Sequence, residues 1–258
     1  MADAAATPGL PDDFVTDDAA VVCEGCGYRL DGLPSSANCP ECGFSVAAST
    51  IDSPRAATAW EAKGRAASFI RTTARVVCSP TAFYRTLKAR PDAGEVAAAR
   101  RFRTFHLAVA SGLFAAGLIT HYLVTSPTAR WIWYGQRMPD WLLVVPWAVV
   151  ALLTFCAALT TAAMAARLTA WEAGWRGMRL PIAVARRCLC YHAAHATLAA
   201  LIFAVIAVGY KLLWTFDLVG YASFVPYIAA LSACAIGGAV YLFWTYWVGM
   251  RNMQYANV

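Results

Sequence analysis

Charged residues are scarce in this chain, and that scarcity excludes an ordinary soluble domain. Asp, Glu, Lys and Arg make up 14% of the 258 residues, whereas hydrophobic residues make up 60%. Soluble domains hold roughly a quarter charged and about half apolar residues. The charge-poor part begins after Arg103, so we expect an aqueous N-terminal arm followed by a membrane body.

The N-terminus lacks the features of a secretory signal. Residues 1–20 are acidic and contain proline, with neither a basic start nor a short apolar run. We therefore expect no cleavage here. The low hydrophobicity of this stretch predicts a disordered tail over residues 1–20.

Catalytic signatures are also missing. The sequence holds no Ser/His/Asp signature, paired-carboxylate cluster, phosphate-binding glycine loop or His-Glu-x-x-His motif. The long apolar runs contain no Asp, Glu, Lys or Arg, so they predict no proton relay or ion-coupling carboxylate within the membrane. We expect a protein that is not an enzyme.

Four charge-free runs are each long enough to cross about 30 Å of hydrocarbon as a helix. They are Thr104–Thr125, Trp141–Ala166, Cys188–Tyr210 and Pro226–Met250. Pro146 either starts the second span or kinks it, and the sequence leaves open whether the last run forms one helix or two. The expected fold is an all-α integral membrane bundle of four transmembrane helices over residues 104–258, with a small N-terminal zinc-ribbon module.

Basic residues predict the orientation of this bundle. The arm through Arg103, the loop between the second and third spans and the C-terminal end together hold 18 Lys and Arg, whereas the other two loops hold 3. Short basic loops resist translocation. We therefore expect a protein of the cytoplasmic (inner) membrane with both termini in the cytoplasm.

Residues 54–103 are expected to form juxtamembrane helices. Ser79-Pro80 is typical of a helix start, and Asp92-Ala-Gly-Glu95 has the form of a capping box that opens a helix running into the first span. The segment Ala56–Val77 could form an amphipathic helix on an anionic inner leaflet, or its arginines could merely set the topology.

Two Cys-x-x-Cys pairs give the strongest motif in the chain. Cys23 and Cys26 are separated by twelve residues from the second pair, Cys39 and Cys42, and a glycine follows each pair. Four thiolates on two tight turns suit one zinc ion, so residues 21–48 predict a zinc ribbon. Two disulfides are the alternative, but a cytosolic location argues against them. Iron is a second alternative, because each half resembles a rubredoxin knuckle, although rubredoxins separate the knuckles more widely.

A site with four thiolate ligands has no open position, which indicates a structural ion and an interaction module. Arg29 is the one basic residue of the ribbon, and acidic residues are more numerous. This charge disfavours binding to nucleic acid and favours a protein partner, either cytoplasmic or in the membrane. The lipid bilayer is the other expected partner, and a homo-oligomer stays open. The function that follows is a membrane-anchored adaptor or scaffold.

Histidines in the spans support a second function. His106 with His192 or His195 could ligate haem iron in a membrane redox protein. A small-solute permease is the third hypothesis.

The ribbon resembles a group of bacterial membrane proteins that begin with Cys-x-x-Cys-Gly-Tyr-x-Leu-x-Gly-Leu and Cys-Pro-x-Cys-Gly. The matching positions are Cys23, Cys26, Gly27, Tyr28, Leu30, Gly32, Leu33, Cys39, Pro40, Cys42 and Gly43. Ser79-Pro80-x-x-Phe83 ahead of the first span is similar to the entry segment of Yip-family membrane domains. This resemblance implies a non-enzymatic membrane organiser or trafficking-like factor without catalytic residues.

Overall fold

A computed structural model describes residues 21–50, 53, 55–89, 91–126, 143–178 and 180–257. The chain forms two compact units that divide between Ser53 and Pro54, and Asn257 belongs to the first unit. The tail expected over residues 1–20 lies outside the described residues.

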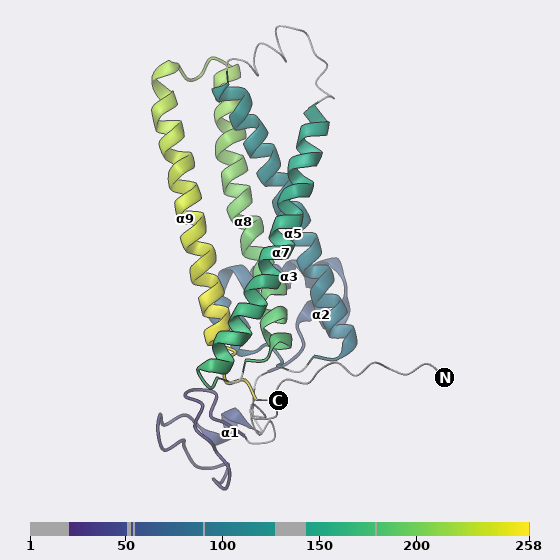
Figure 1. Cartoon of the computed structure of the whole chain (residues 1–258), viewed down its shortest axis with the longest axis vertical. Helices are drawn as coiled ribbons and strands as arrows, with labels where there is room; N and C mark the ends of the chain where they lie inside the picture. Colours follow the sequence, from purple (N-terminus) through teal and green to yellow (C-terminus); the bar gives the residue numbers. More distant parts are fainter. Residues whose placement is uncertain are drawn as a thin grey trace, which may run out of the picture. The chain divides into compact units, whose positions relative to one another are not determined.

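The first unit is small and has little regular structure. Among its described residues the one helix is α1 (Val46–Ser49), and the backbone is paired at two isolated antiparallel bridges, Val22 with Arg29 and Asn38 with Ser45 (Figure 1). Leu30 and Val46 form its apolar core together with two of the cysteines. So few apolar contacts cannot stabilise a unit of this size, which indicates that it needs a further source of folding energy.

The second unit contains four long helices that pack as a bundle (Figure 1). They are α5 (Ala93–Thr125), α7 (Val144–Trp175), α8 (Ile182–Thr215) and α9 (Phe224–Arg251). All four are long and apolar enough to cross a membrane, and the described residues include no β-strand beyond isolated bridges. The predicted all-α bundle of four transmembrane helices is therefore confirmed. Helix α8 is central, because it packs against α5, α7 and α9.

The helices are longer than the charge-free runs that predicted them. At 28 to 34 residues each, they extend about 42–51 Å, well beyond the roughly 30 Å of hydrocarbon. The extra turns of α5 lie at its start, where the predicted capping box forms between Asp92 and Glu95. Pro146 is the third residue of α7, where a missing N–H has no cost, so it starts the span and does not kink it. The last span is one helix.

Three short helices lie beside one end of the bundle. They are α2 (Ala59–Lys63), α3 (Ala66–Cys78) and α4 (Pro80–Arg85). The single helix expected over 56–77 is divided, because Gly64 takes a left-handed φ of 60° that ends α2. Helix α4 begins at Pro80 as predicted, but the Ser79 side chain makes no capping hydrogen bond.

The core of this end is the largest apolar cluster in the unit. Tyr84 and Phe102 are fully buried in it, together with Tyr191 from α8 and Met253 beyond α9. Phe69 of α3 packs against Phe102 and stacks on His106. The short helices are thus part of the membrane unit and not a flexible linker.

Higher along the bundle, α5 and α8 approach closely at Gly117. A Cβ added at this glycine would lie 2.7 Å from the ring of Phe203 and 3.2 Å from the Cα of Ala204. Only a residue without a side chain permits this approach.

Candidate metal centre

The four cysteines lie on two turns of the same construction. In the first turn the Cys23 N–H donates to Tyr28 O at 2.8 Å and the Gly27 N–H donates to Cys23 O at 2.8 Å. Sixteen residues later the Cys39 N–H donates to Phe44 O at 2.8 Å and the Gly43 N–H to Cys39 O at 2.9 Å. Each turn ends on a glycine with positive φ, 84° at Gly27 and 73° at Gly43. The unit is therefore a duplicated knuckle.

The duplicated turns bring the predicted ligands together. Cys23 Sγ lies 3.5 Å from Cys42 Sγ, and Cys26 Sγ lies 3.6 Å from Cys39 Sγ. All four sulfur atoms lie within 4.8 Å of one another. A tetrahedral zinc site with Zn–S bonds of about 2.3 Å places its sulfurs about 3.8 Å apart. The geometry of the cluster therefore fits one metal ion.

Backbone N–H groups point at the first sulfur of each pair. Cys23 Sγ accepts from Gly25 and Cys26, and Cys39 Sγ accepts from the matching positions, Glu41 and Cys42. Such bonds stabilise thiolates, which are the form that binds metal.

The thiols of the cluster titrate differently from one another. Burial and, to a lesser extent, hydrogen bonds with the neighbouring thiols together raise the pKa of Cys26 to about 12. Burial acts to raise the pKa of Cys39 as well, but the N–H groups of Cys42 and Glu41 and the Cys26 and Cys23 thiols outweigh it and lower that pKa to about 7. The neighbouring groups thus stabilise the thiolate form of Cys39, and a bound cation would displace the protons of the other thiols.

The cluster can hold an ion but leaves little room for chemistry on it. Four thiolates complete a tetrahedral set, and a Cβ at Gly25 would already lie 3.3 Å from Cys42 Sγ. A metal ion bound by these thiolates would supply the folding energy that the small apolar core lacks.

The predicted membrane histidines do not form a comparable site in the described part of the chain. Both ring nitrogens of His106 are hydrogen-bonded, Nδ1 to Thr197 Oγ1 at 2.9 Å and Nε2 to Thr73 Oγ1 at 3.0 Å. His195 Nδ1 lies 2.6 Å from the Tyr241 hydroxyl. His106 therefore has no ring nitrogen available for haem iron without losing a hydrogen bond.

One buried polar cluster was missed by the sequence analysis. Arg187 of α8 donates to both carboxylate oxygens of Glu61 in α2, with Nη2–O distances of 2.7 Å, and it also donates to Lys88 O. The two side chains are 3% and 0% exposed. Arg187 had been assigned to the loop that sets topology. A detectable signal was the capping box of Thr58 and Glu61, which fixes the glutamate at the start of a helix.

Arg55 makes a second such link. Its guanidinium donates to the carbonyls of Tyr84, Leu87 and Asn252 at 3.0–3.1 Å. The arm is thereby hydrogen-bonded to the C-terminal end of α9.

Comparison with known proteins gives no relative for either unit. No protein-family model, no curated protein and no solved structure matches the chain. The resemblance to ribbon-bearing bacterial membrane proteins and to Yip-family domains therefore gains no support from these comparisons. What the residues and geometry establish is a membrane-spanning helical protein with a four-cysteine cluster able to bind a metal ion.

Proposed function

We propose that this chain is a non-enzymatic, membrane-anchored adaptor whose zinc ribbon holds a protein partner at the membrane. The observation that carries the proposal is the closed four-thiol cluster on a compact unit of its own, in a chain with four span-length helices. Because four protein ligands fill a tetrahedral site, the metal has no position for a substrate. The thiolate set favours zinc in that role.

The surface of the ribbon suits a protein partner. Tyr28 and Phe44 occupy equivalent positions in the two knuckles and are 40% and 42% exposed. Exposed aromatic rings are enriched at the buried centres of protein interfaces. These two side chains are the proposed contact residues.

The charge of the ribbon restricts the kind of partner that it can bind. Only Arg29 opposes the carboxylates of Glu24, Asp31 and Glu41, and a zinc ion with four thiolates adds about two further negative charges. A phosphate backbone would be repelled by this module. We expect a partner with basic residues around an apolar contact.

The proposed location is the cytoplasmic membrane with both termini in the cytoplasm. Its support is the excess of basic residues, 18 against 3, at the end of the bundle that carries the arm. Reporter fusions test this orientation. A reporter that is active only in the cytoplasm should be active when fused after the last helix, and a reporter that is active only outside the cytoplasm should be active when fused between the first two spans.

The first test is the metal content per chain of detergent-purified protein, measured beside its visible spectrum. One zinc ion and no colour are expected. A haem band would instead favour the membrane redox hypothesis, and iron without haem would change the identity of the ribbon metal.

The second test separates the metal from the partner. Cys39→Ser should abolish zinc binding and partner capture, whereas Cys78→Ser, an exposed cysteine outside the cluster, should change neither. The double change Tyr28→Ser and Phe44→Ser should keep zinc and lose the partner. A partner that binds Cys39→Ser as well as the unchanged protein would refute the adaptor function.

A further inference from the structure

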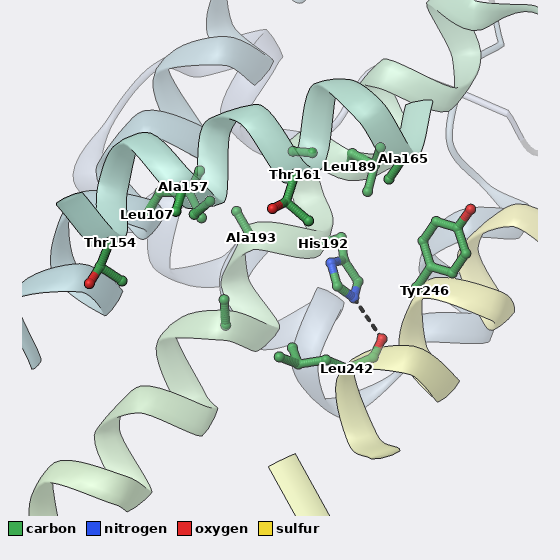
Figure 2. Close-up of a pocket in the computed structure, with 13 residues that line it drawn as sticks. Leu107, Thr154, Ala157, Thr161, Ala165, Leu189, His192, Ala193, Leu242 and Tyr246 are labelled. Carbon is green, nitrogen blue, oxygen red and sulfur yellow. Dashed lines mark hydrogen bonds between the residues drawn. The ribbon is translucent and has the colours of Figure 1, made fainter. Parts of the chain in front are cut away.

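A cavity of about 450 Å³ lies within the second unit among its transmembrane helices. Figure 2 shows its walls, which come chiefly from α7 and α8, with Leu242 and Tyr246 of α9 on one side. The volume lies within the range of ligand pockets, about 300–1,000 Å³. Alanines at four positions of α7 and two of α8 leave the space open, because larger side chains would fill it. This cavity has no part in the proposed adaptor function.

The cavity has the length and position of a lipid chain. From Thr154 to Ala165, its lining on α7 extends about 16 Å along the helix, which is about half of the hydrocarbon thickness. Arg167 follows that lining by two residues on α7, and Arg186 precedes Leu189 on α8. The cavity therefore runs from the charged end of the bundle toward the membrane centre. It is lined by no charged residue.

A polar atom with a defined role faces this space. His192 Nε2 lies 3.0 Å from Leu242 O and 3.1 Å from the Thr245 hydroxyl. Because the carbonyl can only accept, Nε2 carries the proton and donates it. The other nitrogen, Nδ1, is then a hydrogen-bond acceptor. Figure 2 shows that nitrogen on the opposite side of the ring from Leu242, toward Ala193 and Thr161. Within the described part of the chain, no donor bonds to it.

Thr161 adds a second polar group to the same space. Its neighbour Thr160 donates to the carbonyls of Cys156 and Ala157, as threonines in membrane helices commonly do. The Thr161 hydroxyl makes no such bond to any described residue, and it points into the cavity in Figure 2. An acceptor and a hydroxyl beside an apolar channel specify a ligand with a hydroxyl group and a hydrocarbon chain.

We propose that this cavity binds an acylglycerol, with one acyl chain along α7 and a free glycerol hydroxyl donating to His192 Nδ1. The uncharged lining favours a neutral lipid, since a phosphate would need a cation that the lining does not supply. The hydroxyl is the specific feature, because an ester carbonyl cannot donate to Nδ1.

The test uses full-length protein in phosphatidylcholine nanodiscs that contain a diacylglycerol with a photoreactive group in one acyl chain. Labelling should saturate with the probe and map to 154–165 and 189–196. Unlabelled diacylglycerol should compete, whereas its acetyl ester, which lacks the hydroxyl, and phosphatidylglycerol should compete at least tenfold less well. Equal competition by all three lipids, or labelling that rises linearly with the probe, would overturn the proposal.

A matched pair of variants locates the site. Ala162→Phe fills the cavity and should reduce labelling at least fivefold, whereas Ala163→Phe changes the next residue, which is exposed and does not line the cavity, and should leave labelling unchanged. Equal loss in both variants would indicate lipid bound nonspecifically around the bundle, against the proposal. The competition series uses the unchanged protein, so it remains decisive if Ala162→Phe fails to insert.

Discussion

Glu61→Gln is expected to destabilise the membrane unit strongly, because it removes the negative charge that neutralises Arg187 in this buried ion pair. The side chains of the pair are 3% and 0% exposed, and the guanidinium holds the carboxylate through bonds of 2.7–3.1 Å. Removing one partner of a buried ion pair typically costs about 3–5 kcal/mol, since the remaining charge cannot be solvated. Glutamine keeps the shape of the side chain and can still accept one hydrogen bond, so we expect about 3 kcal/mol. In a unit of this size that loss corresponds to a fall in Tm of roughly 6–12 °C.

Glu172→Gln provides the matched control. Glu172 forms an ion pair with Arg176 at 2.7 Å within α7, but the two side chains are 52% and 56% exposed. Exposed pairs contribute about 0–1 kcal/mol, so this variant should unfold within a few degrees of the unchanged protein.

The assay is thermal unfolding of detergent-purified protein, followed by tryptophan fluorescence. The double change Glu61→Leu with Arg187→Met should recover part of the loss, because it leaves no buried charge unpaired. Equal Tm values for Glu61→Gln and Glu172→Gln would show that the pair contributes no more than a surface contact, and would refute the reasoning.

Three further predictions concern the bundle and the ribbon. Gly117→Ala should lower the Tm by several degrees, because its Cβ would lie 2.7 Å from an aromatic ring of α8. The control Gly237→Ala should not lower the Tm, because there is open space around Gly237. Equal Tm values for the two variants would show that the α5–α8 contact adapts freely. Zinc affinity should rise with pH through the neutral range, because burial raises the pKa of Cys26 to about 12 and its proton must leave before the sulfur binds. The pKa of Cys39 is lowered to about 7, so this thiol is already partly deprotonated and contributes less to the pH dependence. A zinc affinity that is the same at pH 6 and pH 8 would contradict binding by these thiolates. Gly43→Ala should weaken zinc binding about tenfold in a competition titration with a chelator, because a side chain at φ 73° costs roughly 1–2 kcal/mol; unchanged affinity would mean that the knuckle tolerates a side chain there.

The parts of this protein that could be predicted from its sequence depend on neighbours along the chain. The ribbon is one case, since each pair of cysteines and its glycine lies within five residues, and that spacing alone determines the turn. The start of α5 is another, because the capping box of Asp92 and Glu95 spans four residues. The four spans follow from composition, which is also local.

The parts that could not be predicted depend on contacts across the chain. Glu61 and Arg187 are separated by 126 residues, and nothing in the sequence near either one identifies its partner. An arginine beside an apolar run is also explained by its effect on membrane topology, so the sequence gives no reason to expect that it is buried. The end of α7 and the start of α8 extend beyond the charge-free runs for a related reason, because a helix ends at its caps, whereas those runs end where charge begins.

The hydrogen bonds of the arm limit where a partner of the ribbon can bind. Thr58 is buried in the membrane unit, where its hydroxyl lies 3.0 Å from that of Tyr191, so the chain is already fixed at this residue. The ribbon's helix ends at Ser49, nine residues earlier. Nine residues reach at most about 30 Å when fully extended. Under the proposed adaptor function, so short a connection predicts a partner that is itself at or near the membrane.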